Sequence, residues 1–141
     1  NRGPLLSPKL FNELMVPRYK EITAALASKG VVYNVLDCDG CIYELVPGWL
    51  AGGINVMFPI EAAHTDPMEL RKRFDPRLRM IGGVDKRALI KGAAAIDREL
   101  DKLAPLVAEG GYIPTLDHRV PPDVSFADYL YYLEKRKQVW G

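Results

Sequence analysis

The chain has 141 residues, of which 48% are hydrophobic and 26% are charged, and its formal net charge at pH 7 is +1. These values are typical of an ordinary globular domain and exclude a strongly basic nucleic-acid-binding surface. No apolar run reaches the roughly 18 residues that a membrane-spanning helix needs. No signal peptide is visible and two cysteines make no disulfide framework, so we expect a cytoplasmic protein without a membrane partner.

Helical and extended patterns alternate along the chain. Ser7 and Pro8 are typical of a helix start, and apolar residues then recur at helical spacing until Gly30, with a kink expected at Pro17. Short apolar runs predict four strands, at 31–36, 54–58, 78–81 and 112–116. Further helices are predicted at about 42–50, 66–74 and 86–109, and from 125 onward.

The order of these elements is one helix followed by four strand–helix units. Strands at this spacing predict right-handed crossovers and a parallel sheet. No GxGxxG or GxxxxGK[ST] pattern follows a strand, which disfavours a nucleotide-binding doubly wound sheet. Four units are half of an eight-unit barrel, and no strand precedes the first helix. We therefore predict one α/β domain over residues 1–141, the C-terminal half of a parallel (β/α)₈ TIM barrel.

Each predicted strand is followed by an acidic residue. Active sites of parallel α/β folds form at the C-terminal ends of the strands. An acid at this place can also cap the next helix, where the helix dipole favours negative charge. The acids that follow the four strands are Asp37 with Asp39, Glu61, Asp85 and Asp117.

Residues 110–124, GGYIPTLDHRVPPDV, combine an acid, an imidazole and a guanidinium between a strand and a proline pair. Histidine transfers protons near neutral pH, so His118 is the first catalytic candidate, together with Asp37 and Asp39. Arg119, Glu61, Asp85 and Asp117 are candidates for substrate binding. Two carboxylates and an imidazole also suit a hard divalent metal, which makes Asp37, Asp39 and His118 the candidate metal ligands.

Cys38 and Cys41 form a CxxC pattern at the end of the first strand. Such a pair is compatible with redox chemistry, and metal binding by it would need two further ligands. Both interpretations stay open at the level of sequence.

Three segments resemble the uroporphyrinogen decarboxylase superfamily, which includes cobalamin-dependent methyltransferases. SPKLFNELMVPRYKEI at 7–22 is similar to the family helix SPxLFxxFxxPxxKxI. LRMIGGVDKRAL at 78–89 is similar to its GxIDxxxL element, and YIPTLDHRVPPDV at 112–124 to its GHGIxPDxP closing loop. The resemblance spans nearly the whole chain and implies the C-terminal half of a (β/α)₈ barrel.

The resemblance implies an enzyme of one of two kinds. A decarboxylase, a lyase of porphyrin biosynthesis, would act on a carboxylated small molecule such as a porphyrinogen, and His118 matches the active-site histidine of the closing loop. A methyltransferase would bind zinc and work with a corrinoid protein. In that branch a His-x-Cys-Gly motif and a cysteine of the closing loop bind zinc. Here the motif's place reads Asp37-Cys38-Asp39-Gly40, which departs from it, and His118 stands in place of the cysteine.

A third hypothesis is a non-catalytic half-barrel. Half of a barrel exposes two sheet edges that a closed barrel lacks. We therefore expect either a homodimer or a separate N-terminal half as the partner of this chain.

Overall fold

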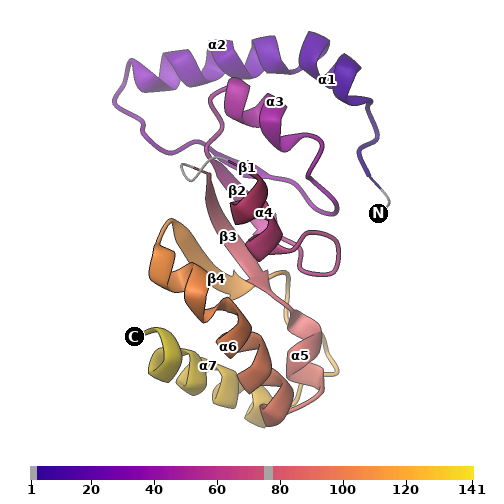
Figure 1. Cartoon of the computed structure of the whole chain (residues 1–141), viewed down its shortest axis with the longest axis vertical. Coiled ribbons are helices and arrows are strands. Elements are labelled where there is room, and N and C mark those ends of the chain that lie inside the picture. Colours follow the sequence, from indigo (N-terminus) through magenta and orange to yellow (C-terminus); the bar gives the residue numbers. More distant parts are fainter. Residues whose placement is uncertain (1–2, 75–77) are drawn as a thin grey trace.

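The computed structural model describes residues 3–74 and 78–141 and contains one parallel sheet with helices between its strands (Figure 1). The sheet order is β1-β2-β3-β4, and all three neighbouring pairs are parallel. The predicted alternation of strands and helices and the sequential strand order are thereby confirmed. The elements are α1 (Pro8–Leu14), α2 (Val16–Ala27), β1 (Val35–Asp37), α3 (Val46–Ala51), β2 (Val56–Ile60), α4 (Pro67–Arg73), β3 (Arg79–Val84), α5 (Lys86–Ile90), α6 (Ala93–Glu109), β4 (Tyr112–Leu116) and α7 (Phe126–Trp140).

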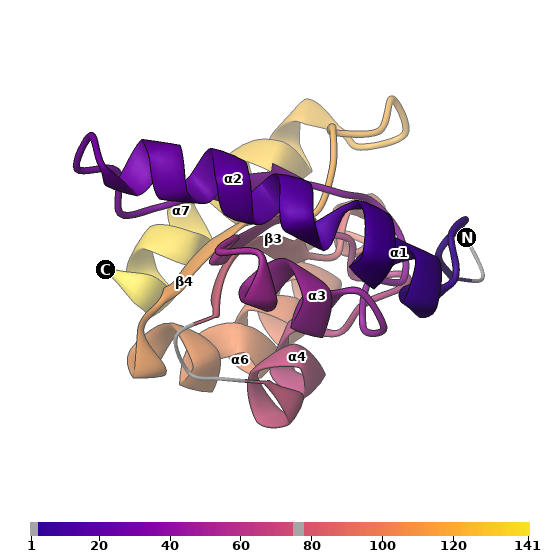
Figure 2. The same cartoon turned by 90° about the horizontal axis from the view of Figure 1, so that it is seen from above.

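The hydrophobic core lies between the sheet and the helices on one of its faces. Met57, Met80 and Tyr112 are register partners on β2, β3 and β4, and all three are buried. Figure 2 shows α3, α4 and α6 on the same side of the strands. α6 contributes the largest apolar set to this core, spaced along one helical face: Ala95, Ile96, Leu100, Leu103 and Leu106.

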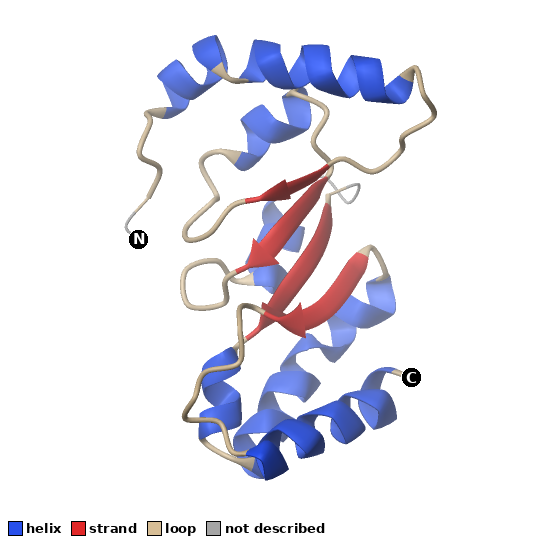
Figure 3. Ribbon diagram, turned by 180° about the vertical axis from the view of Figure 1, so that it is seen from behind, coloured by secondary structure: helices blue, strands red, loops and turns tan. Residues whose placement is uncertain are grey.

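The opposite face of the sheet is open (Figure 3). Val35, Phe58 and Ile113 lie on three different strands and are 53%, 37% and 59% exposed. Strands of an ordinary closed barrel bury such side chains in its interior. The sheet is therefore a partial barrel, with helices on its outer face and an uncovered inner face. No helix in the described part of the chain has both the length and the apolar character needed to cross a bilayer.

The first predicted strand, 31–36, is wrong over residues 31–34. β1 covers only 35–37, because the Asn55 side chain takes hydrogen-bonding groups that a strand neighbour would use. Its Nδ2 donates to the Val32 carbonyl at 2.8 Å, and its Oδ1 accepts from the Asn34 N–H at 2.9 Å. Side-chain bonds of this kind compete with a sheet ladder.

Two further strands end later than predicted, while the predicted strand 112–116 is confirmed as β4. β2 runs to Ile60 through a register irregularity after Met57. β3 runs through Gly82 and Gly83, where the sequence predicts a stop. Both glycines have positive φ, and Tyr112 Oη donates to the Gly82 carbonyl at 2.7 Å. The glycine pair therefore does not end the strand. It lets the Tyr112 hydroxyl come close to the backbone of β3.

The predicted helices also differ in their boundaries. The helix does not kink at Pro17 but is interrupted after Leu14. Pro17 lies in the first turn of α2, where the backbone N–H that proline lacks would have no acceptor within the helix. The predicted helix 86–109 is divided into α5 and α6 at Gly92, whose φ of 80° no α-helix accommodates. The predicted helix 42–50 begins only at Val46.

We expect Gly82→Ala to destabilise the fold more than Gly110→Ala does, by about 1–3 kcal/mol, the range of overpacking effects. Both glycines have positive φ, so both substitutions strain the backbone. A Cβ at Gly82 would also lie 2.7 Å from the backbone nitrogen of Ile60, whereas one at Gly110 meets nothing within 4 Å. Urea unfolding of the two variants measures the difference. Equal losses would mean that β2 moves aside freely.

We also expect the 141-residue chain to self-associate in solution. β1 and β4 are edge strands, and the inner face exposes apolar side chains on both of them, Val35 and Ile113. Unpaired strand edges beside an apolar surface favour pairing with another chain. Light scattering at micromolar concentration should give a mass above that of one chain. A monomeric mass with cooperative unfolding would show that the open sheet is stable alone.

Candidate functional site

A hollow of about 480 Å³ lies at the C-terminal ends of the strands. It gathers residues from the ends of β1, β2 and β4, which a parallel sheet brings to one edge. Two carboxylates, an imidazole and a guanidinium therefore share one space with apolar side chains. Its lining residues are Asp37, Asp39, Phe58, Pro59, Leu116, His118 and Arg119.

The His118 ring is held by its own loop. Its Nδ1 accepts a hydrogen bond of 2.9 Å from the backbone N–H of Arg119. An Nδ1 that accepts carries no proton in the neutral ring, so the proton of that ring lies on Nε2. Among the described residues, Nε2 has no hydrogen-bond partner. His118 thus presents a free N–H in a hollow that can admit a ligand.

The loop that carries Asp37 and Asp39 is fixed by the loop after β2. Glu61 Oε2 accepts from the Gly40 N–H at 2.9 Å. Thr65 Oγ1 donates to the Gly40 carbonyl at 2.7 Å and accepts from the Ile42 N–H at 3.3 Å. Thr65 is 1% exposed, so this junction is buried. The sequence singles out Glu61 for substrate binding and misses Thr65, because no local pattern relates 61 or 65 to 40.

Asp117 is fully buried, at 0% exposure. Its Oδ2 accepts from the Ala62 N–H at 3.2 Å, and its Oδ1 accepts from Lys86 N and Nζ at 3.2 and 3.4 Å. Burial raises the pKa of the Asp117 carboxyl, against the opposing effect of Lys86. Asp117 therefore ties the ends of β2, β3 and β4 together directly beside His118. In this structure it has no exposed surface for a substrate.

Asp85 lies at the end of β3 and caps α5. Its Oδ1 accepts from the Arg87 backbone N–H at 2.9 Å. Hydrogen bonds from the Arg87 side chain hold the pKa of Asp85 below its usual range, with burial acting against them. Neither Asp85 nor Glu61 lines the hollow. Of the acids that follow the strands, only Asp37 and Asp39 therefore line the hollow, together with His118.

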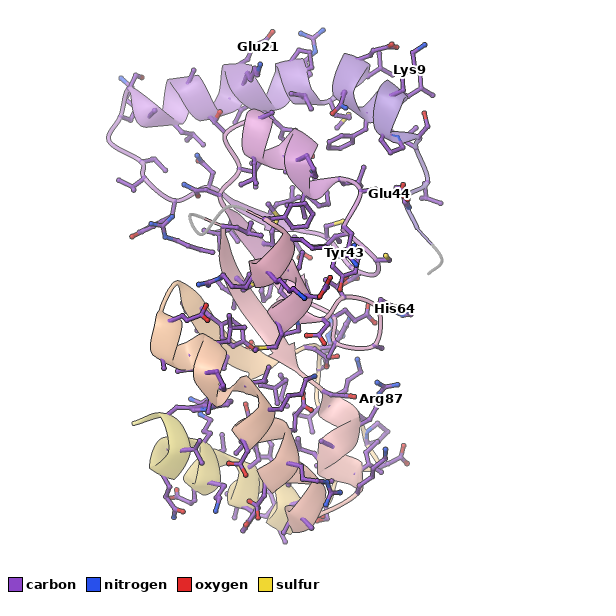
Figure 4. The ribbon with its side chains drawn as sticks, viewed as in Figure 1. Lys9, Glu21, Tyr43, Glu44, His64 and Arg87 are labelled. Atoms are coloured by element: carbon purple, nitrogen blue, oxygen red, sulfur yellow. The ribbon has the colours of Figure 1, made fainter. Side chains whose placement is uncertain are left out.

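His64 and Arg87 lie on the same side of the molecule as the strand ends (Figure 4). His64 Nε2 is 3.8 Å from Glu61 Oε1, and the Arg87 guanidinium is paired with Asp85 at 2.7 Å. Neither residue lines the hollow, so the only imidazole and the only guanidinium among its described lining residues are those of His118 and Arg119.

Nearly the whole chain matches the model of a known family. The family model described as uroporphyrinogen decarboxylase (URO-D) matches residues 2–139. The chain belongs to the uroporphyrinogen decarboxylase family. The partial barrel agrees with this membership, and the resemblance of the three sequence segments is thereby confirmed at the level of the superfamily.

The two cysteines of this URO-D family member are free thiols. Burial raises the pKa of the Cys38 thiol, and the neighbouring Asp39 and Asp37 add to this effect. A protonated thiol is a poor nucleophile and a poor metal ligand, which weighs against redox chemistry at this CxxC pattern. Sequence alone leaves the pattern ambiguous because it does not show the charges around the sulfur.

The candidate metal ligands of this family member do not form a metal site in the described residues. Within 3–74 and 78–141, no group of three or more His, Cys, Asp or Glu side chains is close enough to hold a metal ion. Asp37, Asp39 and His118 line one hollow but do not converge on a point. The donors among the described residues therefore do not fit the zinc centre that the methyltransferase branch implies.

Proposed function

We propose that the protein containing this chain is a decarboxylase that acts on a carboxylated small molecule in the hollow at the strand ends. The observation that carries the proposal is the shared lining of Asp37, Asp39, His118 and Arg119. Arg119 is a cation that can bind a carboxylate, and His118 is a group that can transfer a proton. Family membership supports decarboxylation as the reaction class.

The chemical step needs one proton. The bond between the carboxylate carbon and its neighbour breaks, CO₂ leaves, and the electron pair stays on the substrate carbon. The His118 ring delivers its Nε2 proton to that carbon and then regains a proton at Nε2 from solvent, while Nδ1 keeps accepting from the Arg119 N–H. The carboxylates of Asp37 and Asp39 accept hydrogen bonds from N–H groups of the substrate, since their carboxylate oxygens make no hydrogen bond to described residues.

The test measures CO₂ release by the complete native protein from carboxylated substrates, beginning with uroporphyrinogen. Arg119→Gln should raise KM about tenfold or more, the size of a lost charged hydrogen bond. The matched control is Arg87→Gln, since the Arg87 guanidinium is paired with Asp85 and does not line the hollow. Methyl transfer to a corrinoid without CO₂ release, or an unchanged KM in Arg119→Gln, would contradict the proposal.

A further inference from the structure

Asp39 lies just beyond the part of the chain that the sheet holds in place. Asp37 belongs to β1 and is the register partner of Phe58, so the sheet itself fixes its position. A hydrogen bond of 2.8 Å from the Cys38 N–H to the Phe58 carbonyl continues this pairing by one residue. No strand pairing of the described residues includes Asp39. Its place in the hollow therefore depends on what holds the chain on its C-terminal side.

The residue after Asp39 is held by the loop that follows β2. The Gly40 N–H donates to Glu61 Oε2 at 2.9 Å, and the Gly40 carbonyl accepts from Thr65 Oγ1 at 2.7 Å. The Glu61 side chain is only 18% exposed, and a hydrogen bond to a carboxylate is stronger than one between neutral groups. Asp39 therefore stands between two residues, Cys38 and Gly40, whose backbone groups are both bonded to neighbouring segments.

The loop that carries Glu61 is in turn held by the end of β4. The Ala62 N–H donates to Asp117 Oδ2 at 3.2 Å, and Asp117 is fully buried and directly precedes His118. β1 and β4 are the two outer strands of the described sheet, so the strands alone leave His118 and Asp39 far apart in the strand order. A continuous path of bonded groups nevertheless joins them, and the Glu61 carboxylate is a link in it.

Glu61 is not among the described residues that line the hollow, so it reaches a substrate only through Gly40 and Asp39. We propose that Glu61 is a positioning residue, which sets the place of the Asp39 carboxylate relative to the His118 ring. Groups of a site keep their productive geometry when bonded residues behind them hold it, and a misplacement of about 1 Å can lower a rate about 10²-fold. The kinetic consequence rests on the proposed function, whereas the hold of Glu61 on the loop does not.

Hydrogen exchange of the complete native protein measures this hold without turnover. Glu61→Ala removes the acceptor of the Gly40 N–H, so this amide should exchange about tenfold faster, the size of a lost hydrogen bond to a charged group. Glu61→Gln keeps an oxygen that accepts the same bond and should retain most of the protection. The matched control is Glu44→Ala, which changes an exposed acid in the turn before α3 and should leave the exchange at Gly40 as it is (Figure 4). Unchanged exchange at Gly40 in Glu61→Ala would overturn the proposal.

Rates of CO₂ release test the link from Glu61 to Asp39. In Glu61→Ala, kcat should fall about tenfold or more, while KM changes less because Arg119 still binds the substrate carboxylate. Glu61→Gln should restore most of the lost kcat. Asp39→Asn alone should also lower kcat, and adding Glu61→Ala to it should lower kcat little further, since both changes act through the same carboxylate. Losses that multiply in the double variant would show that Glu61 does not act through Asp39, and would overturn the proposal.

Glu61→Asp provides a second variant that keeps the charge and shortens the side chain by one methylene. Its carboxylate reaches the Gly40 N–H less well, so this amide should exchange faster in Glu61→Asp than in Glu61→Gln. The reverse order would mean that charge rather than reach holds the loop, and would overturn the proposal. Absence of CO₂ release from every substrate would contradict the proposed function alone. CO₂ release together with unchanged Gly40 exchange in Glu61→Ala would contradict the positioning role alone.

Discussion

His118→Ala should lower the turnover number of the complete native protein at least about 10²-fold, the scale of lost general acid–base catalysis. His118 lines the hollow at the strand ends, and its Nε2 has no partner among the described residues. Removing the ring removes the proton donor proposed for the step after CO₂ loss. Steady-state kinetics at saturating substrate measures the effect, and the loss should appear in kcat rather than in KM.

The matched control is His64→Ala, because His64 is the other histidine of the chain and does not line the hollow. Its turnover should stay close to that of the native protein. Both variants should unfold at nearly native denaturant concentrations, since the His118 side chain makes only one local hydrogen bond. A fully active His118→Ala protein would show that the ring is an exposed loop residue without a role in turnover.

The fold was largely predictable because parallel strands leave a strong apolar signal. The four apolar runs and their spacing predict the sheet and its strand order. Strands of a parallel sheet are buried, and buried strands are visible in the sequence as apolar runs. The boundaries were not predictable where a distant group decides them. Asn55 ends the regular pairing of the segment before Val35, and the Tyr112 hydroxyl bonds to the carbonyl of Gly82 inside β3.

The candidate site was predictable to the extent that strand ends define it. Asp37, Asp39, His118 and Arg119 follow strands, so the topology alone brings them to one edge. The fixed loop at Gly40 joins residues more than twenty positions apart and leaves no local pattern.

Asp117→Ala should lower the free energy of unfolding by about 1–3 kcal/mol, the cost of leaving buried hydrogen-bond donors without an acceptor. The change leaves the N–H of Ala62, the N–H of Lys86 and the Lys86 ammonium without their acceptor. Asp117→Asn keeps one carbonyl acceptor and should lose less. Asp123→Ala, an exposed acid in the same loop, is the control and should change stability by less than about 0.5 kcal/mol. Urea unfolding at pH 7 compares the three variants, and an Asp117→Ala chain as stable as Asp123→Ala would contradict the tie between the strand ends.

The pH dependence of the Asp117→Asn variant tests the burial of the carboxyl separately. Burial raises the pKa of Asp117 in the folded chain above the unfolded value, which is about 3.9 for an aspartate. The folded chain therefore binds this proton more tightly. The pH-dependent part of the contribution of Asp117 to stability is full below the unfolded pKa and is lost as the pH rises through the folded pKa. Asparagine does not titrate, so the advantage of the native chain over Asp117→Asn should grow as the pH is lowered from 7 to 4. Urea unfolding of both chains at several pH values measures this difference, and an advantage that shrinks toward pH 4 would mean that Lys86 and the backbone donors outweigh the cost of burial.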